Sequence, residues 1–482
     1  MSSQPLTAGI IGAGIAGLGA AIALRRAGLQ VEVYERSRFK NEIGAAISAP
    51  PNATAVLRRW GFDFAAAKAV PNLSTRYALA GDLVAVFEFQ YEDIETMMGS
   101  PSLSFHRVDL HNGLRALATE GEERDGIVSG EGEGGTRRGK GTPVAIRLGC
   151  EVRNIDCENG VLMMADGTQV QKDLVIIADG AHSTLLNDFL GRPAPALPTG
   201  RSIYRWLVSM DDVMADPELA EQYRNKLPGF LGWLDATTRT LWVNYTCRDG
   251  SVLNNAVVHD SGGIFSSQGW SKDGRGHDEE DISAAKETVL ETLSNFHPAA
   301  RRVVSIASED GIKVHRHFKR PPLESFVRGR TAIIGDAAHV MLPTHAAGSA
   351  IAIESTSVLE VLFRDVEGRL NGSVDSDSGQ GTEIDGGRER TIKKRLQLFD
   401  KLRIPRCNFT MLISNAGSDG LRAQGVEQEI RRFYSGPLPP KDALPWSSQF
   451  REVLFHYDAF KEAEQALKDE KASRNAGTDD WL

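Results

Sequence analysis

A glycine-rich turn between a short apolar run and an alanine-rich segment constrains the fold of this chain most. Residues 8–11 form a continuous apolar run typical of a buried parallel strand, and residues 15–27 are predicted to form a helix. Between them, Gly12 permits the turn, Gly14 lets a pyrophosphate approach the backbone, and Gly17 lets the helix pack closely on the strand. Strand, turn and helix in this order predict a dinucleotide site with its phosphates at the helix N-terminus.

Two further features extend this site. A second predicted strand, residues 29–34, leads into Glu35, whose carboxylate is placed to accept hydrogen bonds from a ribose diol. More than three hundred residues later, the apolar residues 331–334 lead into a second glycine turn that begins at Gly335 and Asp336. The two turns predict one long cofactor, with its adenine half at the first turn and its reactive half at the second. FAD meets this requirement.

Composition narrows the class of protein. The 482 residues carry a net charge of -9 without a dense basic stripe, which argues against a nucleic-acid partner. The four cysteines show no CxxC spacing, so neither a metal site nor a disulfide framework is expected, and a reducing, cytoplasmic setting is favoured. The apolar run at residues 8–24 is interrupted by five glycines and belongs to the nucleotide turn, so no membrane span is expected.

A different pattern starts at about residue 193. Aromatic residues become frequent up to residue 318, and the segments 241–247 and 252–258 are predicted strands joined by a turn. We therefore expect an antiparallel sheet inserted between two parts of the nucleotide fold. Helices are expected at residues 282–296, 349–366, 388–415 and 449–471.

These patterns predict an α/β protein with a discontinuous Rossmann-like FAD-binding domain, an inserted antiparallel-sheet substrate domain and C-terminal helices. The FAD-binding domain is expected at residues 1–80, 100–190 and 325–366, the substrate domain at 81–99 and 191–324, and the helical region at 388–482. Residues 120–142 and 368–387 are rich in Gly, Ser and charge, and are expected to form flexible insertions.

Several separate motifs occur along the chain in a fixed order. They are Gly12-x-Gly14-x-x-Gly17 with Glu35, Gly44-Ala45-Ala46-Ile47 with Pro51-Asn52-Ala53, His106-Arg107-Val108-Asp109-Leu110, Asp179-Gly180-Ala181-His182-Ser183, and Gly335-Asp336-Ala337-Ala338-His339 followed by Pro343 and Gly348. Together they resemble the single-component FAD-dependent aromatic hydroxylases (group A flavoprotein monooxygenases), particularly the salicylate-hydroxylase-like branch common in fungal secondary metabolism. The resemblance covers most of the chain outside the two insertions.

The resemblance implies the reaction and its cofactors. NADPH or NADH would reduce a non-covalently bound FAD, and a flavin C4a-hydroperoxide would transfer oxygen to a phenolic or polyketide-like aromatic substrate. The expected partner is this small molecule alone, and the chain is expected to be a monomer or a homodimer.

The resemblance also assigns the cofactor-binding residues. Glu35 would hold the adenosine ribose, Arg107 and Ala46 would line the FAD, and Asp336 would bind the ribityl-pyrophosphate portion. The backbone N–H groups of Gly348 and Ser349 would lie by the isoalloxazine ring, where the positive end of a helix favours the negative charge of the reduced flavin. The full expected set is Gly12, Gly14, Gly17, Glu35, Arg36, Ala46, Arg107, Asp179, Asp336, Gly348 and Ser349. For Asp336, helix capping is the alternative role.

Two departures from the family pattern affect the flavin loop and the reductant. Where the family commonly has Gly-Gln-Gly-Ala-Asn, this chain has Ala346-Ala347-Gly348-Ser349-Ala350, which leaves fewer polar side chains near the flavin. The family's Asp-Gly segment often continues to an arginine, but here Ser183 is followed by Thr184. Because that segment is linked in the family to nicotinamide-dependent reduction, the use of reductant is an open question.

Arg205 and Tyr245, expected to lie across the inserted sheet from each other, are the candidate catalytic residues. Arg205 would hold a substrate phenolate and Tyr245 would relay a proton or donate a hydrogen bond; the alternative is that they form a structural pair. For His339 and His345, packing is favoured over acid–base chemistry. Of Trp206 and Trp242, either could line a substrate pocket, and one is expected to fill the core.

Three functions stay open at this point. The first is an aromatic hydroxylase. The second is a related flavin oxidoreductase such as an epoxidase or a dehydrogenase; a flavin halogenase is disfavoured because the chain has no Trp-x-Trp-x-Ile-Pro segment. The third is a catalytically quiet FAD-binding protein.

Overall fold

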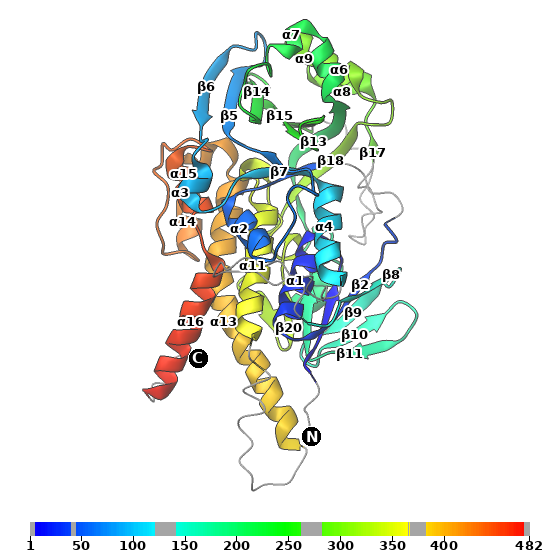
Figure 1. The fold of residues 1–482 in the computed structure, drawn as a ribbon, viewed down its shortest axis with the longest axis vertical. Coiled ribbons are helices and arrows are strands. Elements are labelled where there is room, and N and C mark those ends of the chain that lie inside the picture. Colours follow the sequence, from blue (N-terminus) through cyan, green and yellow to red (C-terminus); the bar gives the residue numbers. More distant parts are fainter. Residues whose placement is uncertain are drawn as a thin grey trace, which may run out of the picture.

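A computed structural model describes residues 5–39, 45–120, 141–261, 282–364, 366 and 382–476. The ribbon shows an eight-stranded sheet with short helices at one end, the nucleotide fold in the middle, and long helices beside it (Figure 1). Most of the two expected insertions, and Gly44 of the second motif, lie outside the described residues.

A six-stranded sheet carries the nucleotide fold, in the order β19-β20-β12-β1-β2-β8. Pairing is parallel except at the β19–β20 edge. The strands are β1 (Thr7–Ile11), β2 (Gln30–Glu35), β8 (Ala145–Leu148), β12 (Leu174–Ile177), β19 (Val327–Arg328) and β20 (Thr331–Ile333). The predicted strand, turn and helix at the N-terminus are confirmed as β1 and α1 (Ile15–Arg26).

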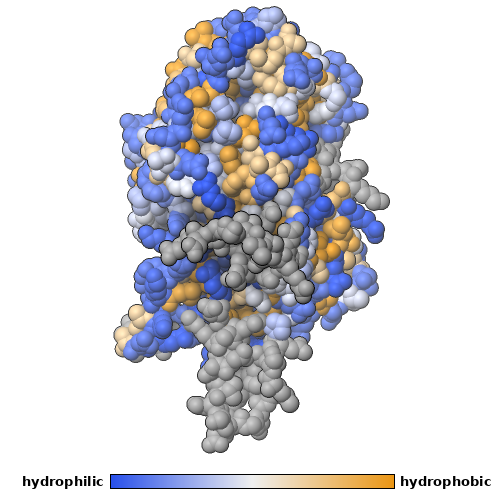
Figure 2. All heavy atoms as spheres, viewed as in Figure 1, coloured by the Kyte–Doolittle hydropathy of each residue, from blue (hydrophilic) through white to orange (hydrophobic). Residues whose placement is uncertain are grey.

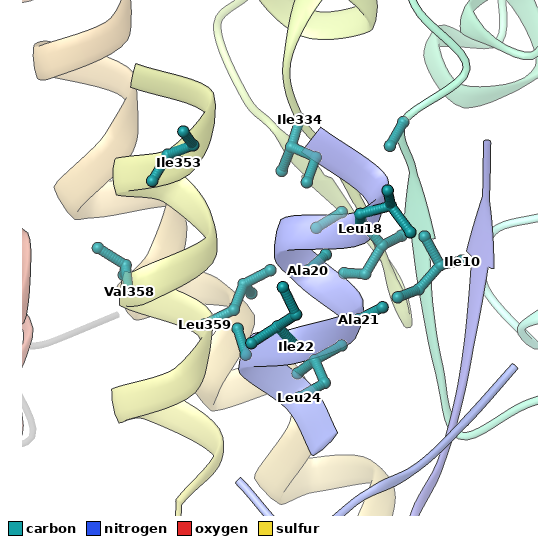
Figure 3. Close-up of a cluster of buried hydrophobic side chains, with 14 of the residues drawn as sticks. Ile10, Leu18, Ala20, Ala21, Ile22, Leu24, Ile334, Ile353, Val358 and Leu359 are labelled. Carbon is teal, nitrogen blue, oxygen red and sulfur yellow. The ribbon is translucent and has the colours of Figure 1, made fainter. Parts of the chain in front are cut away.

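Helix α1 packs on this sheet, and α4 (Arg107–Thr119) and α11 (Gly348–Phe363) pack against α1. Side chains of α1 meet Ile10 of β1 on one side and Leu359 of α11 on the other (Figure 3). These residues are fully buried, and most residues of α1 are buried as well. Helix α1 therefore packs between the sheet and α11. The packing fixes the start of α11 relative to the first glycine turn.

Two three-stranded sheets flank the nucleotide fold. One contains β9 (Val152–Asp156), β10 (Val161–Met164) and β11 (Gln169–Gln171), with a hairpin turn at Gly167 between β10 and β11. The other contains β3 (Ala46–Ala49), β7 (Leu103–His106) and β4 (Val70–Pro71), and brings Ala46 opposite His106.

The second large sheet has eight strands in the order β17-β18-β13-β16-β15-β14-β5-β6. It is antiparallel as predicted, except that β14 and β5 run parallel. The strands are β5 (Ser74–Leu79), β6 (Ala85–Gln90), β13 (Leu197–Ser209), β14 (Gly229–Asp235), β15 (Thr240–Cys247), β16 (Val252–Asp260), β17 (Ile282–Ser283) and β18 (Lys313–Lys319). The substrate domain was expected to begin at residue 81. Strand β5 lies before that residue but belongs to this sheet, because it pairs with β14.

The two faces of this sheet have different neighbours. One face packs against four short helices, α6 (Met210–Ala215), α7 (Pro217–Ala220), α8 (Lys286–Thr292) and α9 (Pro298–Ile306). Both Trp206 and Trp242 lie in that core, with ring centroids 5.2 Å apart. The expectation that one of them fills the core is therefore confirmed, and the second tryptophan does so as well. The other face carries Phe230 and Tyr245 and meets the C-terminal helices.

Two predicted helices are interrupted. Residues 282–296 were expected to be one helix, but Ile282–Ser283 pairs with β18 as β17, and α8 occupies only Lys286–Thr292. Residues 449–471 divide into α15 (Ser448–Phe455) and α16 (Ala459–Asn475), because Asp458 starts a new helix by accepting a hydrogen bond from Lys461 N.

The remaining helices complete the fold. They are α2 (Pro51–Arg59), α3 (Ile94–Met98), α5 (Leu186–Leu190), α10 (Asp336–His339), η3 (Pro343–His345), α13 (Thr382–Asn415), η4 (Gly417–Arg422) and α14 (Val426–Arg431). Among the described residues, no helix combines the length and apolar character needed to cross a membrane. Polar and apolar side chains alternate over the face seen in Figure 2, without one continuous apolar band.

Candidate flavin and substrate site

The first glycine turn is crowded at two positions and open at the third. A Cβ on Gly17 would lie 1.9 Å from the Gly12 carbonyl oxygen, and one on Gly12 would lie 2.5 Å from the Ala178 carbonyl oxygen. No atom lies within 4 Å of the corresponding position on Gly14. Two glycines therefore let the backbone close up, and the third leaves room at the start of α1, where a pyrophosphate would meet free N–H groups.

Glu35 ends β2 beside this turn. Its buried carboxylate accepts hydrogen bonds from the backbone N–H groups of Ala13 and Ser37, both at 2.7 Å. These bonds fix the carboxylate against the turn. The side chain of the next residue, Arg36, is exposed beside it.

The N-terminus of α4 brings two more groups to the turn. Arg107 is the first residue of α4; its backbone N–H donates to the Ala45 carbonyl at 2.8 Å, and its side chain has no hydrogen bond or ion pair with the described residues. One turn later, His111 lies 2.8 Å through Nε2 from the Ala13 carbonyl oxygen. Sequence analysis missed His111, although its spacing of four from Arg107 places both on one helix face.

The second glycine turn lies directly against the first. A Cβ on Gly335 would come within 2.7 Å of the Ala16 side chain in α1. Asp336 begins α10 after the N-cap residue Gly335 and makes no capping hydrogen bond, so the alternative role of a helix cap is wrong. Its carboxylate oxygen lies 3.8 Å from the position of a Cβ on Gly348, where α11 starts as predicted.

Three expected residues lie around this junction. The hydroxyl of Ser349 donates to the Ser48 carbonyl of β3 at 3.4 Å, and Ala46 of the same strand donates its N–H to Asn254 Oδ1 of β16 at 3.0 Å. Asp179 follows β12, with its Cα 3.1 Å from the position of a Cβ on Gly12. Burial raises the pKa of the Asp179 carboxyl, and its Oδ1 has no hydrogen-bond partner among the described residues.

Arg205 and Tyr245 share the face of the large sheet that contains Asn254. In the register, Arg205 lies opposite Ala256 and Tyr245 lies opposite Asn254, so both side chains project on the side that reaches Ala46. Neither the guanidinium nor the hydroxyl has a hydrogen bond or ion pair among the described residues. Burial lowers the pKa of Arg205; the Tyr245 hydroxyl and Asp336 oppose this shift, and the charge of Arg107 adds to it.

Charged groups from two parts of the nucleotide fold affect Arg205. Arg107 begins α4 and Asp336 begins α10; the positive charge of Arg107 lowers the pKa of Arg205, and the negative charge of Asp336 raises it. A half-buried guanidinium without a partner among the described residues is suited to hold an anionic group.

Aromatic side chains cover the space next to Tyr245. Phe230 lies 4.9 Å from the Tyr245 ring and 4.8 Å from Trp446, measured between centroids. Ala346 of the flavin loop packs against the same cluster. This arrangement provides an apolar surface next to Tyr245, as an aromatic ring would require.

The two histidines of the flavin segment are buried. His345 stacks on Phe450 with centroids 4.5 Å apart, and burial lowers the pKa of His345 to about 3. Burial likewise lowers the pKa of His339 to about 4, with Asp336 opposing the shift. Both are therefore neutral at physiological pH, in agreement with a packing role.

Comparisons with known proteins agree with this geometry. Residues 10–50 match the NAD(P)-binding Rossmann-like domain family, and residues 156–367 match the FAD binding domain family. The FAD-dependent monooxygenase cfoG of Aspergillus candidus is 29% identical over 99% of both chains. Hispidin-3-hydroxylase of Neonothopanus nambi is 27% identical over 97% of both chains.

A solved structure shows the same fold. The salicylate hydroxylase substrate complex superposes with a TM-score of 0.66 at 21% identity, over 96% of this chain and 98% of the other. The two glycine turns lie together as an FAD site requires, and along its whole length the chain is similar to FAD-dependent monooxygenases of the aromatic-hydroxylase type.

Proposed function

We propose that this chain is a cytoplasmic enzyme that uses NAD(P)H and O2 to hydroxylate a phenolic or polyketide-like aromatic compound. The observation that carries the proposal is the half-buried Arg205 guanidinium, which has no partner among the described residues and shares its face of the large sheet with Tyr245. The named activities of the relatives support a phenolic substrate. All four cysteines are free thiols, which supports a reducing compartment.

The cofactor-binding residues are proposed as the set predicted from sequence. The open Gly14 would receive the pyrophosphate, Glu35 the ribose, and the exposed carboxylate of Asp336 the ribityl hydroxyl groups. The amides of Gly348 and Ser349 would face the flavin ring. When bound and reduced, the flavin activates O2 and supplies an electrophilic oxygen atom.

The protein's own groups would prepare the aromatic ring. A guanidinium in a poorly solvated site lowers the pKa of a bound phenol, because it favours the phenolate. A phenolate ring is richer in electrons and reacts faster with an electrophilic oxygen. Tyr245 would donate a hydrogen bond to the same oxygen, since burial raises the pKa of its hydroxyl and keeps it protonated. The cluster around Phe230 and Trp446 would exclude water.

The test uses purified, FAD-loaded protein and a panel of phenolic acids and polyketides. We expect a phenol to stimulate the loss of NADH or NADPH and to yield a product heavier by one oxygen atom. Arg205→Met should abolish this stimulation, whereas Arg205→Lys should retain part of it. Reductant consumption that no phenol stimulates would support a catalytically quiet protein, and an oxidised product without added oxygen would support a dehydrogenase.

A further inference from the structure

A buried group of one carboxylate and two guanidiniums lies between α11 and α13. Glu354 of α11 accepts a hydrogen bond from Arg403 Nη2 at 2.9 Å and another from Arg406 Nη2 at 2.8 Å. Glu354 and Arg403 are completely inaccessible to solvent, and Arg406 is nearly so. We call these three residues the Glu354 cluster. With one negative and two positive charges, it carries a net charge of about +1.

No second carboxylate in the described part of the chain pairs with either guanidinium. Arg403 donates to the Ser355 hydroxyl and the Ile351 carbonyl, and its buried Nη1 has no partner there. Arg406 donates to two carbonyl groups of α15 and lies 4.4 Å from the centroid of the Tyr457 ring. The other groups that bind the two arginines are therefore neutral, and the cluster keeps its net positive charge.

The Glu354 cluster lies close behind the flavin site. Glu354 follows Gly348 by six residues on the same helix, a rise of about 9 Å. Asn52 of α2, three residues after β3, donates to Glu354 Oε1 at 2.6 Å. His339, three residues after Asp336 in α10, is also buried. The medium between cluster and site is thus buried protein, which screens charge poorly.

We propose that the Glu354 cluster raises the reduction potential of the bound flavin by holding a positive charge behind the N-terminus of α11. The flavin ring gains negative charge on reduction, and a buried cation within about 10 Å stabilises that charge. The effect adds to that of the helix N-terminus. The inference rests on FAD binding and holds whichever aromatic compound is hydroxylated.

A purely structural role for the cluster makes a different prediction. Buried ion pairs lock helices together, and removal of any one partner then weakens the packing in the same way. An electrostatic role depends on the sign of the charge removed: the loss of an arginine and the loss of the glutamate should shift the flavin potential in opposite directions.

The test is the midpoint potential of bound FAD, measured without any aromatic compound. For Arg403→Gln and Arg406→Gln we expect a roughly tenfold weaker preference for the reduced flavin, a lowering of about 30 mV for a two-electron couple. For Glu354→Gln we expect a rise of similar size. Arg403→Lys retains the charge and should keep the wild-type potential.

Arg395→Gln is the matched control. Arg395 is a buried arginine on the same helix, but it is paired with Glu470 at 2.7 Å and lies about two turns farther along α13. It should lose stability without a shift in potential. Shifts of one sign in both kinds of variant, unchanged potentials, or loss of FAD from all three charge variants would overturn the proposal. A failure to find a phenolic substrate would leave these potentials unaffected and would count against the proposed function alone.

Discussion

Asp109 in α4 and Arg248 in the turn between β15 and β16 form a two-armed ion pair, with Nε–Oδ2 at 2.8 Å and Nη2–Oδ1 at 3.0 Å. Arg248 and the next two residues all have positive φ angles, so the turn is held in an uncommon backbone conformation. The pair joins the large sheet to the helix that begins with Arg107. It therefore connects the proposed substrate face to the cofactor site.

Arg248→Ala should weaken FAD binding more than it weakens the fold. The Arg248 side chain is 37% exposed, so we expect a stability loss of no more than about 1 kcal/mol. The dissociation constant of FAD, measured by flavin fluorescence, should rise several-fold because the start of α4 loses its support. Arg432→Ala, which removes an exposed ion pair with Glu429, should leave FAD affinity unchanged. Equal FAD affinity in both variants would contradict this role.

The same pair predicts a pH dependence. Burial opposes ionisation of Asp109, but Arg248 outweighs it and holds the pKa of the Asp109 carboxyl below its usual value. The stabilisation is therefore complete above about pH 4 and is lost as the pH falls through the lowered pKa. Urea unfolding of wild type and Arg248→Ala should differ by a constant amount from pH 5 to 8, and the difference should shrink below about pH 4. A difference that grew on acidification would reverse the assigned sign.

The glycines of the first turn predict two different failures. In Gly17→Ala the new Cβ would clash with the Gly12 carbonyl at 1.9 Å, so we expect a loss of several kcal/mol and little folded protein. In Gly14→Ala the new Cβ would meet no atom within 4 Å, so the apoprotein should fold with near-normal stability. Its methyl group would occupy the space of the pyrophosphate, and FAD titration should detect no tight binding. Normal FAD affinity in Gly14→Ala would place the phosphates elsewhere.

The elements that sequence analysis predicted depend on local chemistry. The turn at Gly12, the strand leading to Glu35 and the start of α11 at Gly348 each follow from residues adjacent in sequence. The turn that joins β15 to β16 sets Tyr245 opposite Asn254, but Arg205 reaches the same face only because the distant strand β13 pairs with β16.

Other features depend on contacts between distant segments. The residues around Ile282 predict a helix, but Ile282 pairs with Val314 as part of a strand. The Glu354 cluster joins residues about fifty positions apart, and no spacing in the sequence marks them as partners. The burial of both Trp206 and Trp242 likewise follows from four helices that cover one face of the sheet.

The flavin loop carries backbone strain at Ala346. Its φ of 52° lies in the left-handed region, where glycine is favoured, and its methyl group packs on the aromatic cluster. Ala346→Gly should relieve the strain and raise the free energy of unfolding by up to about 1 kcal/mol. Ala347→Gly, at a neighbouring residue with right-handed backbone angles, should instead lower it by about 0.5–1 kcal/mol. Thermal unfolding of the two variants should therefore shift in opposite directions, and a parallel shift would show that the loop is unstrained.

Tyr245→Phe separates catalysis from stability. The hydroxyl makes no hydrogen bond with the described residues, so its removal should change the free energy of unfolding by no more than about 0.5 kcal/mol. Loss of a hydrogen bond to a phenolate should reduce the rate of phenol hydroxylation about ten- to a hundredfold. Burial raises the pKa of Tyr245, with Arg205 opposing, so the hydroxyl stays protonated. The pH–rate profile of Tyr245→Phe between pH 6 and 9 should therefore have the same shape as that of wild type.

Tyr223→Phe is the control for this prediction. The Tyr223 hydroxyl donates to Asn244 at 2.8 Å, so that variant should lose stability and keep its hydroxylation rate. Full activity in Tyr245→Phe would remove this hydroxyl from the reaction and leave Arg205 as the sole polar contact proposed for the phenolate.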